Sequence, residues 1–170
     1  SKDVALVGAE IYHSGDSLTI TIVLTERQRV AAIRASGTQG GDSKAAALTA
    51  DNGAFFDITS NPQVTEYGLT IVETLDDLKP LITAIQIDYN DGTIIITMSE
   101  IINSGSVDLT KLRIINSPGN GLIELGNSIL TVSEDFNITV RLNEDKRVQA
   151  IRQSASCLLY TSDAADDTCC

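Results

Sequence analysis

The 170-residue chain contains no Trp, a single His, and only four Tyr and three Phe residues. So few aromatic side chains provide little material for a ligand pocket or for a platform on which bases or sugar rings stack. Lys and Arg number 12 against 23 Asp and Glu, and the net charge of −11 argues against a nucleic-acid backbone as partner. No apolar run approaches the length of a membrane span, and no signal peptide opens the sequence. We therefore expect neither nucleic-acid binding nor membrane insertion.

Cysteine is confined to the last fourteen residues. Residues 157–170 read CLLYTSDAADDTCC and contain all three Cys residues. This string resembles the conceptual translation of a transposase adapter used in DNA-sequencing libraries, which implies a non-native tail to be set aside from the fold. Cys169 and Cys170 are then neither a disulfide nor a metal site. We expect the natural chain to continue beyond Ser156, so that the sequence is a fragment.

The chain repeats itself at a spacing of 118 residues. Residues 18–37 read LTITIVLTERQRVAAIRASG, residues 136–155 read FNITVRLNEDKRVQAIRQSA, and ten of the twenty positions are identical. Repetition at a fixed period is typical of an array of modules, and at this length the module is a domain. We predict one unit over residues 1–79 that lacks its opening strands, and a second over residues 80–156 that lacks its closing strands.

Each copy of the repeat predicts the same local structure. Residues 18–25 and 136–143 alternate apolar and polar side chains, which indicates a β-strand with one apolar face. A short helix follows each strand. Thr25 is its predicted N-cap in the first copy, with Gln28 completing a capping box, and Asn143 is the N-cap in the second.

Short strand patterns separated by turns fill the rest of the chain. Thr83–Asp88 and Thr93–Met98 flank Tyr89–Gly92, which is typical of a hairpin with Asp-Gly at the bend. Residues 76–80 predict a linker. The many short strands favour an all-β fold, a β-sandwich. Further strands are predicted over residues 45–48, 55–58, 69–72, 112–115 and 129–132.

The order of these pieces resembles the bacterial Ig-like domains found in tandem in large surface proteins. Pro80 ends a linker, Asp91-Gly92 forms a turn, Thr97–Glu100 reads TMSE, and Val107–Leu112 reads VDLTKL. The closing half of that pattern is a Thr-rich strand, a short helix and a turn, which residues 18–37 and then Asp57–Pro62 supply. The resemblance implies Ig-like β-sandwich repeats with a short helix after one strand of each unit. It also implies an extracellular or cell-surface spacer or adhesive stalk.

The sequence offers no pattern for catalysis. His13 has Thr131 as its counterpart in the second copy, so it is interpreted as a surface residue rather than a catalytic base. No G-x-S-x-G elbow, P-loop or dinucleotide-binding fingerprint occurs. We predict no catalytic or cofactor-binding residue and no enzymatic activity.

Two weaker site predictions remain. Asp88, Asp91 and Glu100 lie near one end of the predicted hairpin, and Ca²⁺ binds several oxygen ligands at once. No Asp-x-Asp-x-Asp spacing enforces such a site, so turn-forming Asp residues are the alternative. Asn137 begins the sequon Asn137-Ile138-Thr139, a candidate for N-glycosylation, whereas the first copy has Thr19 at that position.

The sequence as a whole predicts a structural protein. The main hypothesis is a repeat module of an extracellular filament or surface fibre whose partners are copies of itself, joined head to tail. The joints are either covalent, in one long array, or formed by strand complementation between subunits. The alternative is a calcium-dependent adhesin stalk or spacer in a large cell-surface protein, and glycans are a further candidate partner.

Overall fold

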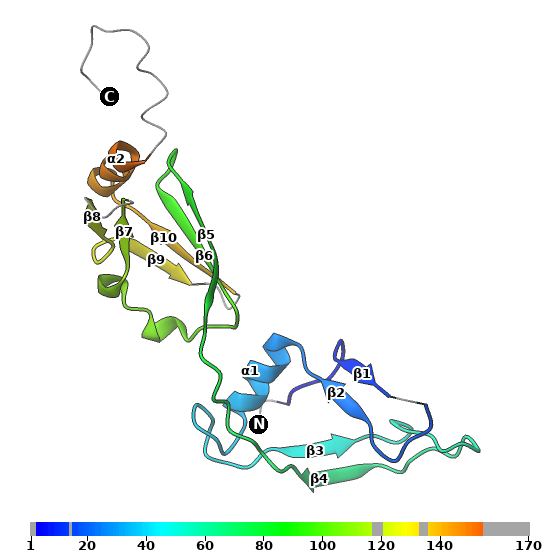
Figure 1. Cartoon of the computed structure of the whole chain (residues 1–170). Helices are drawn as coiled ribbons and strands as arrows, with labels where there is room; N and C mark the ends of the chain where they lie inside the picture. Colours follow the sequence, from blue (N-terminus) through cyan, green and yellow to red (C-terminus); the bar gives the residue numbers. More distant parts are fainter. Residues whose placement is uncertain (1–2, 14, 117–120, 133–135, 155–170) are drawn as a thin grey trace, which may run out of the picture. The chain divides into compact units, whose positions relative to one another are not determined.

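The computed structural model describes residues 3–13, 15–116, 121–132 and 136–154 (Figure 1). These residues are mostly β: ten strands form small antiparallel sheets, and two α-helices and two short 3₁₀ helices accompany them. None of the described helices is long and apolar enough to cross a membrane. The chain divides into two compact units, unit 1 (Ser1–Lys79) and unit 2 (Pro80–Cys170).

Unit 1 consists of two separate hairpins and a helix. The first hairpin pairs Ile11 with Ile22, and the second pairs Leu48 with Leu69. The helix lies between the two hairpins in sequence and begins directly after the first. The elements are β1 (Glu10–Tyr12), β2 (Thr21–Val23), α1 (Glu26–Arg34), β3 (Ala47–Ala50) and β4 (Glu66–Thr70).

Unit 2 contains a four-stranded antiparallel sheet in the order β5-β6-β10-β9 and a separate β7–β8 hairpin. The helix α2 follows β10 and contacts β8. The elements are β5 (Ile82–Asp88), β6 (Thr93–Met98), η1 (Ser104–Ser106), η2 (Leu109–Lys111), β7 (Arg113–Ile115), β8 (Leu122–Glu124), β9 (Ile129–Val132), β10 (Asn137–Arg141) and α2 (Glu144–Gln153).

The hydrophobic core of the described chain lies in unit 2. On β10, Ile138 pairs with Ile96 and Val140 with Ile94, and all four side chains are buried on one face of the sheet. Burial of each such side chain contributes about 1.5–3 kcal/mol. The remaining core residues lie in or next to η2, β8, β10 and α2, namely Leu109, Ile123, Leu125, Leu142 and Ala150.

Unit 1 buries little apolar surface. Ala50 is its one buried hydrophobic residue among the described positions, although its strands are rich in Ile, Leu and Val. Among the described strands, β2 has a neighbour on one side only, and β3 and β4 pair only with each other. Apolar side chains on two-stranded sheets have no second layer to pack against.

Most predicted strands form at least in part. The strand predicted over residues 69–72 lies at Glu66–Thr70 as β4, and the one predicted over residues 45–48 lies at Ala47–Ala50 as β3. Other departures are larger. The strand predicted over residues 55–58 is wrong, because that segment is a turn with one isolated bridge, from Phe56 to Pro62. The carboxylate of Asp57 accepts hydrogen bonds from Thr59 and Asn61, and these bonds stabilise the turn instead of a strand. The first-copy strand predicted over residues 18–25 shortens to β2. The strands β1 and β8 were not predicted.

Candidate functional site

The segment from β2 through α1 and the segment from β10 through α2 have the same local structure. Thr25 Oγ1 accepts a hydrogen bond from the Gln28 backbone N–H at 3.3 Å, and Gln28 Oε1 accepts one from the Thr25 N–H at 2.9 Å. Asn143 Oδ1 accepts from the Lys146 N–H at 3.0 Å. The predicted N-caps, and the capping box at Thr25, are therefore confirmed.

The same ion pair closes the first turn of both helices. Arg29 lies 2.6 Å from Glu26, and Arg147 lies 2.6 Å from Glu144. Hydrogen bonding by the Arg147 guanidinium lowers the pKa of the Glu144 carboxyl below its usual value. Arg29 also contacts the carboxylate of Asp76 at 2.5 Å and thereby lowers the pKa of Asp76.

Equivalent serines near the C-terminal ends of the two helices make the same hydrogen bonds. The hydroxyl of Ser36 donates to the Ile33 carbonyl at 2.8 Å, and the hydroxyl of Ser154 donates to the Ile151 carbonyl at 2.8 Å. The Ser36 and Ser154 backbone N–H groups bond the same carbonyls, at 3.1 Å in each copy. The residues that make these contacts are identical at the 118-residue spacing.

The two strands differ sharply in burial. On β10, Ile138 is 6% exposed and Val140 is 0% exposed. Their counterparts in the first copy are Ile20, which is 45% exposed, and Ile22, which is 36% exposed. Packing explains the contrast, because Ile138 and Val140 lie in one buried cluster with residues such as Ile123 and Leu125. In addition, β10 lies between β6 and β9, whereas among the described strands β2 pairs with β1 alone. None of the described strands pairs with β2 on the flank that β6 occupies on β10.

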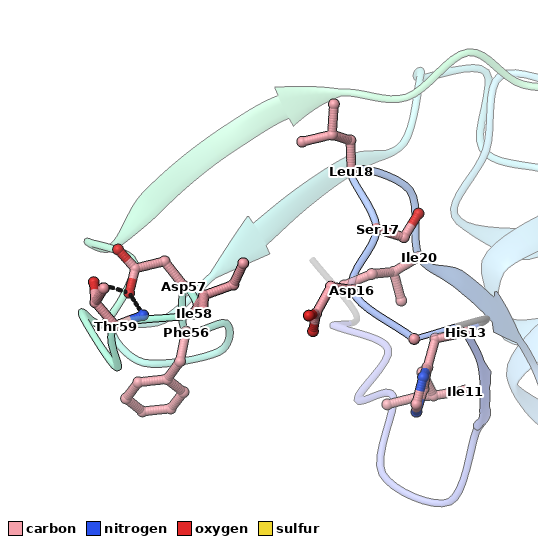
Figure 2. A pocket seen from close by; sticks show the side chains of 11 residues that line it. Ile11, His13, Asp16, Ser17, Leu18, Ile20, Phe56, Asp57, Ile58 and Thr59 are labelled. Carbon is pink, nitrogen blue, oxygen red and sulfur yellow. Dashed lines mark hydrogen bonds between the residues drawn. The ribbon is translucent and has the colours of Figure 1, made fainter.

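Unit 1 also contains a pocket of about 750 Å³ between the β1–β2 loop and the Phe56–Thr59 turn (Figure 2). His13, Asp16 and Asp57 are among its lining residues. Figure 2 shows the Asp16 carboxylate directed away from the His13 ring and the Asp57 carboxylate bonded to Thr59. Hydrogen bonding by Asn61 lowers the pKa of Asp57, so this carboxylate stabilises the turn. The pocket therefore lacks a converging acid–base pair at the described positions.

The predicted calcium ligands are not all brought together. Asp88 Oδ1 accepts from the Asn90 N–H at 2.8 Å and Asp91 Oδ1 from the Thr93 N–H at 2.9 Å, both in the β5–β6 turn. Glu100 follows β6 at the opposite end of the hairpin, where Met98 pairs with Ile82. The prediction that Glu100 clusters with the two Asp residues is wrong, because the strand β6 lies between them. The described residues hold no group of three or more His, Cys, Asp or Glu suited to a metal ion.

Asn137 opens β10 with an exposed side chain. Its Oδ1 accepts a hydrogen bond from the Thr97 hydroxyl at 2.9 Å, and Thr139 of the sequon is half-buried in the same strand. N-glycosylation of Asn137 stays a prediction. The predicted tail, residues 157–170, lies outside the described residues.

Sequence reasoning missed two side chains that organise unit 1. The buried Gln28 amide donates to the carbonyls of Ala5 and Val7, at 2.8 and 3.0 Å, and so ties the N-terminal segment to α1. The Glu73 carboxylate accepts from the Gly37 N–H at 3.1 Å and the Ala46 N–H at 2.7 Å. The capping-box pattern pointed to Gln28, but no sequence signal marked its long-range bonds or those of Glu73.

Comparison with known proteins gave no match: no family model, no curated protein and no solved structure resembles the chain significantly.

Proposed function

We propose that the chain is a structural, non-catalytic part of an extracellular filament or surface fibre. It is built from Ig-like β-sandwich repeats that assemble end to end by strand complementation. The observation that carries this proposal is the paired strand–cap–helix segment, whose caps, ion pairs and C-terminal serine bonds match at the 118-residue spacing. Such agreement supports two copies of one module.

The two units hold different parts of that module. Unit 2 contains the strands that precede the helix, β5 through β10, and unit 1 contains the β3–β4 hairpin that follows it. Superimposing the helices at the repeat spacing would combine these parts into a sandwich in which each sheet covers the other. The exposed Ile and Leu residues of unit 1 support this view, because a completed module would bury them.

A joined chain tests the module directly. Residues 80–154 followed by residues 37–79 would form a single repeat of 118 residues, with the junction at the equivalent positions Ser36 and Ser154. We expect this chain to unfold in one cooperative urea transition, since its two halves share one core. Circular dichroism and the dispersion of amide signals in NMR measure the result.

The control for this experiment joins residues 80–154 to residues 37–79 in shuffled order, which keeps length and composition. We expect the control to retain only the stability of the first part. If the joined chain gains nothing over the shuffled control, the two units do not belong to a common module and the proposal fails.

The calcium-dependent adhesin stalk is the second candidate. Asp88 and Asp91 share one turn, but their bonds to backbone N–H groups are those of ordinary turn residues. The geometry therefore favours the plain structural module.

A further inference from the structure

The segment between the last strand of unit 1 and the first strand of unit 2 has no helix or strand of its own (Figure 1). It covers residues 71–81, and every residue in it except Glu73 is exposed. Leu75 and Leu78, for example, are 55% and 78% exposed. Apolar packing therefore does not hold this linker, and its order depends on its polar contacts.

Two carboxylates fasten the first half of the linker to unit 1. Glu73 accepts hydrogen bonds from the Gly37 N–H at 3.1 Å and the Ala46 N–H at 2.7 Å, in the loop between α1 and β3. Asp76 accepts a hydrogen bond from Arg29 Nη1 on α1 at 2.5 Å. Because Glu73 already holds the chain three residues earlier, the contact of Asp76 closes only a short loop, which costs little entropy.

Arg29 is oriented for this contact by its own helix. Its Nε and Nη2 atoms donate to the Glu26 carboxylate at 2.6 and 2.8 Å, which leaves Nη1 for Asp76. The Arg29 and Asp76 side chains are 31% and 29% exposed, so the pair is partly shielded from water. A guanidinium that is already in position loses less entropy when it binds a carboxylate.

The far end of the linker is fixed to unit 2 at Leu81. The Leu81 N–H donates to the Ser99 hydroxyl oxygen at 2.9 Å, and the Leu81 carbonyl accepts from the Ser99 N–H at 2.8 Å. Between these two anchors, the one hydrogen bond among the described residues is local, from the Leu78 N–H to Asp76 Oδ1 at 3.3 Å. Residues 77–80 are therefore the part of the linker that neither unit holds.

We propose that the Arg29–Asp76 ion pair is a latch that confines the hinge between the two units to Asp77–Lys79. Pro80 does not add to the hinge, because its ring fixes φ and restricts the preceding residue to extended conformations. Without the latch the next anchor is Glu73, and the hinge grows to residues 74–79. At full extension this doubles its reach, from about 10 Å to about 20 Å.

The latch goes beyond the proposed function, because it acts within a single chain whether or not chains assemble. Its first test is the heteronuclear ¹H–¹⁵N NOE of the backbone amides in the full chain, at a concentration where sedimentation velocity shows single chains. We expect residues 71–76 to be as rigid as β4, and residues 77–79 to have clearly lower values. Low values throughout residues 71–79 would overturn the inference.

The variant Asp76→Ala opens the latch without touching a helix or strand. We expect the low NOE values to spread back to Thr74 and to stop at Glu73. The control Asp77→Ala removes the same charge one residue further along, inside the hinge, and should leave the profile unchanged. Mobility that stays within residues 77–79 in Asp76→Ala, or that spreads equally in both variants, contradicts the latch.

The second partner is tested by Arg29→Ala and by the double variant with Asp76→Ala. All three chains should show the same spread of mobility, because each lacks the same ion pair. The amide shifts of α1 verify that the helix persists without Arg29. A double variant that is more mobile than Asp76→Ala alone would mean that the two side chains act separately, and the latch would be wrong.

The rotational correlation times of the two units, from ¹⁵N relaxation, show whether the latch limits their motion. A longer hinge lets each unit tumble more independently. The correlation times of both units should therefore fall in Asp76→Ala and stay constant in Asp77→Ala. If they stay constant in both variants, Asp76 orders only its neighbours, and its role as a latch is overturned.

Discussion

At the scale of single residues, the β5–β6 turn shows how backbone conformation fixes a residue type. Gly92 has a φ of +73°, in the left-handed region that favours glycine. Its N–H donates to the Asp88 carbonyl at 2.9 Å and its carbonyl accepts from the Leu142 N–H at 2.9 Å. A Cβ at this position would lie 3.3 Å from the Arg147 side chain and 3.4 Å from Leu142. The turn thus packs closely against the junction of β10 and α2.

Gly92→Ala should therefore destabilise unit 2. The left-handed conformation costs a residue with a Cβ about 1–2 kcal/mol, and the close contact with Arg147 adds to that cost. Urea unfolding measures the loss in the free energy of unfolding. The control is Gly105→Ala, where the nearest atom to the added Cβ would be 3.6 Å away. We expect the control to change stability by less than about 0.5 kcal/mol, and equal effects at the two glycines would contradict the argument.

At the scale of elements, the two segments that match in sequence at the 118-residue spacing allow an internal comparison. Ile138 on β10 and Ile20 before β2 are identical residues at equivalent positions, and each is followed by an N-capped helix. One is 6% exposed and the other 45% exposed. The difference comes from packing: Ile138 belongs to a buried cluster that includes Ile123 and Leu125, and it pairs with residues of both β6 and β9.

Truncation of these two side chains should have unequal effects. Ile138→Ala leaves a cavity in the core and should lower the free energy of unfolding of unit 2 by about 2–5 kcal/mol. Ile20→Ala should cost no more than about 1 kcal/mol, since much of the side chain is already in contact with water. Urea denaturation of the dilute chain, followed by circular dichroism, compares them. Similar losses in both variants would mean that β2 is buried in solution.

Local sequence signals predicted the strands and turns well where local conformational preferences determine the structure. The alternation and the Asp91-Gly92 turn located β6 residue by residue and β5 to within one residue. The prediction over residues 55–58 failed because a single carboxylate, Asp57, bonds the backbone locally, which periodicity cannot reveal. β1 and β8 are three residues long, too short to show a period of two.

The burial of the two matching strands and the position of Glu100 were less predictable, because both depend on which strands pair with one another. The same alternation in residues 18–25 and 136–143 leads to an open edge in one unit and a buried strand in the other. Likewise, Glu100 is close in sequence to Asp91, but β6 carries it to the far end of the hairpin. Pairing partners and strand direction are long-range properties, and neither is encoded in a short window of sequence.

At the scale of the whole molecule, charge opposes assembly. Each copy carries a net charge of −11, so copies brought together repel one another. Salt should therefore strengthen association, because the Debye length falls from about 30 Å at 0.01 M to about 8 Å at 0.15 M ionic strength.

Calcium should act on the whole molecule only as a source of ionic strength. At matched ionic strength, we expect CaCl₂ and NaCl to give the same association constant and the same melting temperature, and EDTA to change neither. The reason is geometric: Asp88 and Asp91 are each bonded to a backbone N–H, and Glu100 lies at the other end of the hairpin. A rise in melting temperature at low calcium concentrations, reversed by EDTA and not reproduced by NaCl, would favour the adhesin stalk instead. The Asp88→Asn and Asp91→Asn variants would then show whether these two carboxylates hold the ion, since a site built on them would lose the calcium effect in both.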